Sequence, residues 1–231
     1  MKLLIVEDQK ELSSSISSYL SSEKYLCESV HDFYSALGKL CTFEYACVIL
    51  DLSLPFGSGL DILKELKKEN RSEGIIIISA RNSIDDKVQG LHLGADDFLV
   101  KPFHMAELEA RISSVIRRKS FEGKNKINLD NLILDIQEKK LRGPAGNIDL
   151  TRMEYMLLEY LIVNRNKVVT KEAIAEHLCG DDIDLAYDYD FIYTHLKNLR
   201  KKLKNSGSRD GIKNVYGMGY KFHSGQTLIK R

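Results

Sequence analysis

Short apolar runs alternate with segments of helical periodicity along the first half of the chain. An apolar run ends at Val6, and Leu12, Ile16 and Leu20 then recur four residues apart, the pattern of a strand followed by a helix. The same alternation appears four more times. We expect strands at 3–6, 26–30, 45–50, 75–78 and 98–100, and helices at 12–20, 33–40, 60–66, 88–93 and 108–116. Five such units predict an α/β fold with a five-stranded, doubly wound parallel sheet and helices on both faces.

The second half has a different pattern. A polar, charged stretch at 119–125 shows no periodicity and predicts a linker. Strand-like pieces follow at 127–129, 132–136, 140–142 and 148–150, and helical patterns begin at Thr151, at Thr170 and near residue 187. Thr151 and Glu154 form a capping box, and residues 214–220 predict a hairpin. We therefore expect a second domain, of α+β type, at 126–231 after a first domain at 1–118.

The last predicted helix, at about 187–204, has an apolar and a basic side. Apolar residues recur every three or four positions, at Ile192, Leu196, Leu199 and Leu203. The remaining faces carry polar and basic residues, namely Tyr193, Thr194, Lys197, Asn198, Lys201 and Lys202. A helix with an exposed basic face followed by a hairpin predicts a winged helix, which places that helix in the major groove of DNA.

The charge distribution agrees with a polyanionic partner for the second domain. Residues 1–118 contain 14 Lys and Arg and 18 Asp and Glu, a net charge of −4. Residues 191–231 contain 10 basic residues and one acidic residue, a net charge of +9. An acidic front and a basic tail indicate two modules, of which the second faces nucleic acid.

Several protein classes do not fit the sequence. No apolar run approaches the about 18 residues of a membrane helix, and no secretory signal is visible, so we expect a cytoplasmic protein without a membrane partner. The four cysteines are widely spaced and form no CxxC pair. This spacing argues against a disulfide framework or a zinc site.

Polar side chains end the central strands of the predicted sheet. Glu7 and Asp8 follow the first strand and Asp51 the third, while Ser79 ends the fourth and Lys101 the fifth. The carboxyl ends of parallel strands face one crevice, where three carboxylates would repel one another. A divalent cation such as Mg²⁺ would relieve this repulsion, because it binds carboxylate and phosphate oxygens. Lys101 and Ser79 could hold further phosphate oxygens, and a carboxylate there could attack phosphorus to form an acyl phosphate.

The motifs LIVED, DLSLP, ISAR and FLVKPF resemble the receiver domain of two-component response regulators, a flavodoxin/CheY-like fold. LTRMEYMLLEYL, VVTKEAI, HLKNLRKKL and VYGMGYKF resemble the effector domain of the OmpR/PhoB family. The resemblance implies that a sensor histidine kinase phosphorylates Asp51. The protein would then dimerise and bind promoter DNA to regulate transcription. It would be a phosphorelay component rather than an enzyme.

The receiver resemblance also implies roles for the residues around Asp51. Glu7, Asp8, Asp51 and the Ser53 carbonyl would organise Mg²⁺, and Lys101 would pair with the phosphoryl group. Ser79 would be the switch hydroxyl and Phe98 an aromatic switch that turns inward. The Lys101–Pro102 bond would be cis, as X-Pro bonds can be. Ser53 and Arg81 would tune the lifetime of the phosphoryl group.

A homodimer through the fourth helix, fifth strand and fifth helix of the receiver is implied as well. The residues of this face are Lys87, Asp96, Asp97, Glu107 and Arg111. Crossed ion pairs would join the protomers, for instance Lys87 with Glu107 and Asp97 with Arg111. Because exposed ion pairs contribute only about 0–1 kcal/mol each, such an interface would be switchable.

The candidates for DNA contact lie on the predicted recognition helix and the hairpin. They are Thr194, Lys197, Asn198, Arg200, Lys201, Lys202, Tyr216 and Lys221. Asn198 and Tyr216 stand where the family commonly has arginine, which leaves the operator sequence open. The acidic segment 181–190, just before the helix, is expected to meet RNA polymerase or solvent.

Two alternatives remain at this point. A regulator of the same fold could bind DNA without phosphorylation, with the acid pocket kept as structure. A haloacid-dehalogenase-like phosphatase also uses an Asp nucleophile, a Ser or Thr and a Lys. That enzyme needs a second Asp two residues after its nucleophile, where this chain has Ser53, so we disfavour it.

Overall fold

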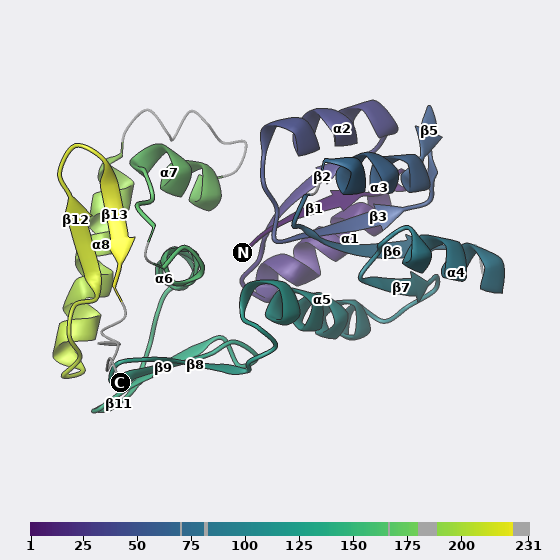
Figure 1. Ribbon diagram of the computed structural model, residues 1–231. Helices are drawn as coiled ribbons and strands as arrows, with labels where there is room; N and C mark the ends of the chain where they lie inside the picture. The colour runs from purple at the N-terminus through teal and green to yellow at the C-terminus, as the bar shows by residue number, and fades with distance from the viewer. Residues whose placement is uncertain (70, 81–82, 166, 180–188, 224–231) are drawn as a thin grey trace, which may run out of the picture. The chain divides into compact units, whose positions relative to one another are not determined.

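The computed structural model divides into two compact units, residues 1–123 and 124–231 (Figure 1). It describes the whole chain except residues 70, 81–82, 166, 180–188 and 224–231. Among the described helices, none is both long and apolar enough to cross a membrane.

A five-stranded parallel sheet forms the centre of the first unit. Its strands lie in the order β2-β1-β3-β6-β7, and each is parallel to its neighbours. They are β1 (Lys2–Val6), β2 (Leu26–Val30), β3 (Cys47–Asp51), β6 (Gly74–Ser79) and β7 (Asp97–Val100). The strands β1, β3 and β6 are buried along their whole length, as expected for a sheet covered on both faces. The predicted fold class is confirmed.

Five helices cover the two faces of this sheet. They are α1 (Lys10–Ser22), α2 (Phe33–Thr42), α3 (Gly59–Lys68), α4 (Ile84–His92) and α5 (Met105–Ser120). Helices α1 and α5 pack together on one face, and α2 and α3 pack together on the other (Figure 1). The core on the second side includes Leu4, Leu50, Ile62, Ile77 and Phe98. These layers leave the carboxyl ends of β1, β3, β6 and β7 at one edge of the sheet.

The first unit differs from the sequence prediction in three places. Helix α4 begins at Ile84 rather than Val88, because the Ser83 side chain caps it by accepting a hydrogen bond from the Asp86 N–H. A small hairpin, β4 (Ser53–Leu54) with β5 (Gly57–Ser58), follows β3 and was not predicted. Helix α5 continues through the first two residues of the predicted linker, and Phe121 after it is buried.

The described residues of the second unit form an antiparallel sheet, three helices and a hairpin. The sheet contains β8 (Lys126–Leu129), β9 (Leu132–Asp135), β10 (Lys140–Gly143) and β11 (Gly146–Ile148) in the order β11-β10-β9-β8. The helices are α6 (Arg152–Val163), α7 (Lys171–Cys179) and α8 (Asp190–Asn205). The hairpin pairs β12 (Ile212–Val215) with β13 (Gly219–Phe222), and a bridge joins Val169 to Tyr220 beside it. This arrangement is a winged helix.

Sequence and structure agree closely in this unit. The capping box is present, since Thr151 Oγ1 accepts from the Glu154 N–H while the Glu154 carboxylate accepts from the Thr151 N–H. Strand β11 lies two residues earlier than predicted, because Gly146, at φ +114°, pairs with Gly143 across a two-residue turn. The predicted start of α8 near residue 187 lies outside the described residues.

Candidate functional site: the carboxyl edge of the receiver sheet

The predicted site residues do come together at the carboxyl edge of the parallel sheet. The backbone of Glu7 follows β1, and Asp51 is the last residue of β3. Asp51 lies opposite Ile78 on β6, so Ser79 is the next residue on the neighbouring strand. The Lys101 N–H donates to the Ser79 carbonyl at 2.8 Å, which holds the residue after β7 beside the end of β6.

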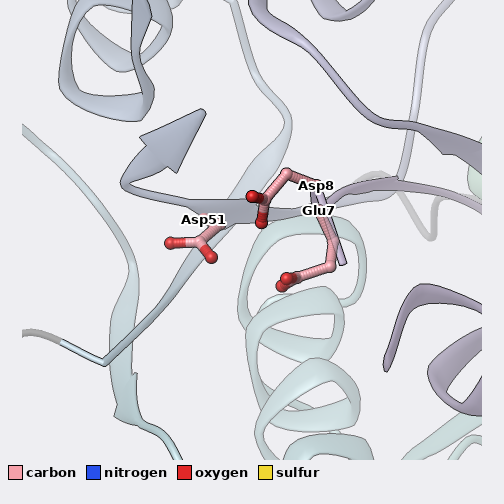
Figure 2. Close-up of side chains that lie close together, drawn as sticks. All are labelled: Glu7, Asp8 and Asp51. Atoms are coloured by element: carbon pink, nitrogen blue, oxygen red, sulfur yellow. The ribbon is translucent and has the colours of Figure 1, made fainter. Parts of the chain in front are cut away.

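Lys101 links two of the three carboxylates. Its ammonium lies 2.6 Å from Asp51 Oδ2 and 2.7 Å from Glu7 Oε2. Glu7 is fully buried, Asp51 is 4% exposed, and Asp8 is exposed. Glu7, Asp8 and Asp51 offer carboxylate oxygens within 4.8 Å of one another, and Figure 2 shows these side chains close together, two just after β1 and one at the end of β3. We call these three carboxylates with Lys101 the acid pocket.

Burial and pairing set the protonation of the acid pocket. Burial raises the pKa of Glu7, and its hydrogen bond with Lys101 opposes that change without cancelling it. Burial alone would lower the pKa of Lys101, but its hydrogen bonds to Asp51 and Glu7, together with the negative charges of both carboxylates, outweigh burial and raise it. Lys101 is therefore a fixed positive charge in this pocket at neutral pH.

The charge and donor set of the acid pocket fit a divalent cation. Three carboxylates and one ammonium leave a net charge of −2 when all are ionised, and all three converging carboxylates present oxygen ligands. Oxygen ligands and excess negative charge are what Mg²⁺ requires. The Ser53 N–H donates to Asp51 Oδ1 at 3.0 Å, which orients the carboxylate. The role of the Ser53 carbonyl stays a prediction.

Ser79 ends β6, the strand beside Asp51, and Phe98 lies on β7, the next strand beyond it. Ser79 is fully buried, and Phe98 on β7 is 3% exposed. A Cβ at Gly90 of α4 would lie 2.6 Å from Ile77 Cδ1 and 3.6 Å from the Phe98 ring, so α4 approaches the sheet closely here. The predicted cis Lys101–Pro102 bond is present. Arg81 lies outside the described residues.

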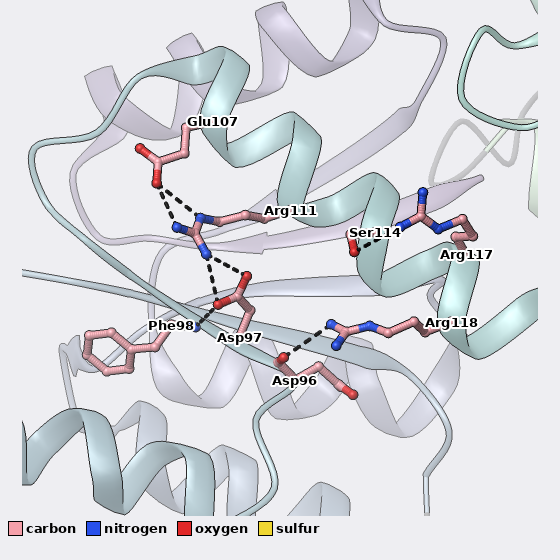
Figure 3. Close-up of polar contacts among 8 residues, drawn as sticks. All are labelled: Asp96, Asp97, Phe98, Glu107, Arg111, Ser114, Arg117 and Arg118. Atoms are coloured by element: carbon pink, nitrogen blue, oxygen red, sulfur yellow. Dashed lines mark hydrogen bonds and ion pairs between the residues drawn. The ribbon is translucent and has the colours of Figure 1, made fainter. Parts of the chain in front are cut away.

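The predicted dimer face carries ion pairs within one chain. Arg111 lies 2.9 Å from Asp97 Oδ2 and 2.8 Å from Glu107 Oε1, so both carboxylates share one guanidinium (Figure 3). Asp96 accepts a hydrogen bond from the Ile75 N–H and pairs with Lys119 at 3.2 Å. Asp96 is thus bound into its own unit, whereas Lys87 on α4 is exposed.

Sequence reasoning missed the apolar part of this face. Ile84 is 80% exposed, and Val88 and Leu91 on the same helix are exposed as well. Their spacing of four and three residues places them in one row on α4. Grouped exposed apolar residues are typical of a surface that another protein covers. The spacing was visible in the sequence, but the late predicted start of α4 hid it.

The outer face of α8 collects most of the predicted DNA contacts. Ile192, Leu196, Leu199 and Leu203 are buried, as predicted. At 100° per residue the opposite face carries Thr194, Lys197, Asn198 and Lys201, all of which are exposed. In the hairpin, Tyr216 is fully exposed and Lys221 partly exposed. Of the acidic segment 181–190, only the last two residues belong to the described part of the chain.

Two basic candidates are engaged inside the second unit. Arg200 donates to the Ile212 carbonyl at 2.7 Å and to Asn214 Oδ1 at 2.8 Å, which joins α8 to the hairpin. Lys202 donates to Glu154 Oε2 at 2.7 Å and to the Asp149 carbonyl at 2.8 Å. Lys202 thus holds α8 against α6, and its predicted contact with DNA stays a prediction. Its position on the flank of the helix, toward the capping box, explains these contacts.

Lys202→Met is expected to lower the free energy of unfolding of the second unit by about 1–3 kcal/mol at pH 7, because a buried Glu154 carboxylate loses its partner. Burial alone would raise the pKa of Glu154, but its hydrogen bonds with Lys202 and Thr151, together with the charge of Lys202, outweigh burial and lower it. The contribution of the pair is therefore present above the pKa of the unfolded chain and lost as pH falls through the lowered one. Urea unfolding at pH 7 measures the loss of stability, and urea unfolding below about pH 4 measures whether that loss disappears in acid.

Lys204→Met, on an exposed lysine of the same helix, is the matched control for this pair. An equal loss of stability in both variants, or a loss that persists unchanged in acid, would contradict the assignment of Lys202.

The comparisons with known proteins cover both units. Residues 3–113 match the family described as response regulator receiver domain, and residues 145–222 that described as transcriptional regulatory protein, C terminal. The chain is 37% identical over 222 residues to the two-component response regulator PhoP of Pseudomonas aeruginosa, which covers 96% of this chain and 98% of that one. It is 37% identical to the response regulator ArlR of Staphylococcus saprophyticus, over 95% of this chain and 97% of the relative.

Solved structures of receiver domains also resemble part of this chain. The signal receiver domain of a putative Luxo repressor protein from Vibrio parahaemolyticus is 30% identical, with a TM-score of 0.51, over 52% of this chain and 93% of that one. A receiver with an acid pocket, followed by a winged helix, defines a DNA-binding response regulator. The chain belongs to the OmpR/PhoB family of these two-component transcription regulators, which work with histidine kinases and bind DNA.

Proposed function

We propose that this regulator accepts its phosphoryl group on Asp51 from a sensor histidine kinase. The observation that carries the proposal is the Lys101 ammonium, which lies within hydrogen-bond distance of both Asp51 and Glu7 at the edge of the sheet. One Asp51 oxygen attacks phosphorus, the bond from phosphorus to the donor imidazole breaks, and the carboxylate becomes an acyl phosphate. The fixed positive charge of Lys101 then pairs with the phosphoryl oxygens.

The other residues of the acid pocket have separate roles. Glu7, Asp8, Asp51 and the Ser53 carbonyl would hold Mg²⁺, which neutralises developing charge on the phosphoryl oxygens when it is bound. The Ser53 N–H keeps the Asp51 carboxylate in one orientation. The Ser79 hydroxyl donates a hydrogen bond to the new phosphoryl group, and the Phe98 ring packs inward behind Ser79. A regulator that ignores phosphorylation is not favoured, because the three carboxylates and Lys101 are all present and lie together.

Phosphorylation would favour a homodimer through α4, β7 and α5. The exposed apolar row Ile84, Val88 and Leu91 would form its centre, with Lys87, Asp97, Glu107 and Arg111 around it. Arg111 already pairs with Asp97 and Glu107 within one chain. When the dimer forms, these residues would replace their intrachain partners with the same residues of the second copy, so few ion pairs are added in total. The energy difference between monomer and dimer is then small enough for a phosphoryl group to shift. The dimer would place two winged helices on promoter DNA, where RNA polymerase is a further partner.

Ile84→Lys is expected to weaken this dimer at least about tenfold, because it places a charge in the apolar centre of the interface. Sedimentation velocity with Mg²⁺ and beryllofluoride, a phosphoryl mimic, measures the dimer. Tyr34→Lys on α2, which replaces another exposed apolar side chain of the receiver, is the control. If both variants dimerise like the parent chain, the interface lies elsewhere.

Beryllofluoride also tests the function as a whole. With Mg²⁺ it should raise the affinity of the full chain for its operator and promote dimerisation. The operator can be obtained by selection from a pool of random-sequence duplexes. Operator affinity and oligomeric state that both stay unchanged would contradict the proposal.

A further inference from the structure

A second polar hollow lies in the first unit, along α1 and the edge strand β2. Its volume is about 390 Å³, at the lower end of the range of small-molecule sites. We call it the serine hollow. Its lining consists of Lys10, Ser13, Ser14, Ser17 and Ser18 of α1 with Ser29 and His31.

The sequence of α1 explains why there is space here. Lys10, Ser13, Ser14, Ser17 and Ser18 are three or four residues apart and share one helix face. Serine side chains are short, so this face leaves room beside β2 that longer side chains would fill. Its surface therefore carries hydroxyl groups beside apolar atoms.

Ser13, in the lining of the serine hollow, has a hydroxyl group without a hydrogen-bond partner. Its side chain is 1% exposed, and its Oγ has no hydrogen-bond partner in the described part of the chain. A buried hydroxyl without a partner is unfavourable and is uncommon in folded proteins. By contrast, Ser15 on the outer side of α1 donates to the Glu11 carbonyl at 2.8 Å. A ligand with acceptor atoms would satisfy Ser13.

The charges around the hollow favour an anion. No Asp or Glu is among its lining residues, and Lys10 has no ion-pair partner within the described ranges. Helix α1 begins at Lys10, and its N-cap Gln9 makes no side-chain capping bond, so the positive end of the helix dipole lies there. His31 Nδ1 donates to the Glu7 carbonyl at 2.8 Å, which fixes the ring and leaves Nε2 as its second polar atom.

We propose that the serine hollow binds a small phosphate monoester that carries hydroxyl groups. Its phosphate is held by the Lys10 ammonium and serine hydroxyls, and its hydroxyl groups bond to the remaining serines and to His31 Nε2. The site is separate from the acid pocket, although His31 connects the two through the backbone of Glu7. Such a ligand would act on the receiver without being its phosphoryl donor.

Titration of the full chain, observed by amide ¹⁵N–¹H NMR in EDTA, tests this proposal. Glycerol 3-phosphate, inorganic phosphate and glycerol are the probes. We expect saturable shifts at Ser13, Ser17 and Ser29 with the first probe. Lys10→Gln and Ser13→Val should each weaken binding about tenfold, the effect of one charge-assisted hydrogen bond. Ser15→Ala should bind like the parent chain.

The three probes distinguish the source of the anion. Tighter binding of glycerol 3-phosphate than of inorganic phosphate supports an ester, and equal binding supports the same site with inorganic phosphate as its ligand. Glycerol binding as well as the two phosphates, or shifts confined to α8 or to the acid pocket, would overturn the proposal. If Ser13→Val does not fold, as judged by its melting temperature, unchanged binding by Lys10→Gln decides against it. A negative result for the serine hollow does not count against the proposal that Asp51 is phosphorylated.

Discussion

Asp51→Asn is expected to abolish phosphoryl incorporation and, with it, the dimerisation and operator binding that depend on phosphorylation. The amide is a very poor nucleophile, and no other carboxylate among the described residues accepts a hydrogen bond from both the Ser53 N–H and Lys101. Incorporation from a radiolabelled small-molecule acyl phosphate donor with Mg²⁺ should fall by at least about a hundredfold, the scale on which removing a covalent nucleophile acts.

The matched control for this loss is Asp61→Asn, on an exposed Asp of α3 that pairs with Lys64. Circular dichroism establishes that both variants fold. Phosphoryl incorporation that Asp51→Asn retains at the parental level would mean that another residue accepts the group.

The second large effect is expected at the outer face of α8. Lys197→Ala combined with Lys201→Ala should reduce the slope of log affinity against log salt by about 1.8, because each phosphate contact contributes about 0.9. If the variant and the parent chain bind equally at 1 M salt, this change in slope makes the variant bind about 60-fold more weakly than the parent chain at 0.1 M salt. The loss should be similar for specific and non-specific duplexes, since phosphate contacts carry no sequence information.

Two single variants serve as controls for this measurement. Lys140→Ala removes an exposed lysine of β10 in the same unit and should leave the slope unchanged. Lys202→Met should also leave the slope unchanged, since its ammonium is held by Glu154 and Asp149. If the salt slope falls as much for Lys202→Met as for Lys201→Ala, Lys202 contacts a DNA phosphate.

The sequence was sufficient to predict the sheet because its apolar runs are short and its helices periodic. Four β-branched residues, Ile75–Ile78, leave little doubt about β6, and they are buried as expected. Prediction failed where tertiary contacts decide. Lys2 lies in the first strand with 1% exposure, since it pairs with Glu28 at 3.0 Å and lies over the Phe43 ring. No local pattern indicates such a buried pair.

The candidate site was predictable for a different reason. Parallel strands bring their carboxyl ends to one edge, so residues at strand ends could be grouped before any distance was known. What sequence could not supply was the partner of each side chain. Arg200 and Lys202 looked like Lys197 and Lys201 by composition, yet their angular positions on α8 direct them to the hairpin and to α6. Candidate residues on a helix flank therefore need the structure.

Signalling by this regulator depends on Asp51 becoming an acyl phosphate in a pocket organised by carboxylates and Lys101. Borohydride reduces an acyl phosphate and marks the carboxylate that carried it. After incubation of the full chain with Mg²⁺ and a small acyl phosphate donor, reduction followed by peptide mass spectrometry should locate the mark at residue 51 alone. Without Mg²⁺ the mark should be nearly absent. A mark on Glu7 or Asp8, or no mark on any carboxylate while Mg²⁺ is present, would contradict the central claim.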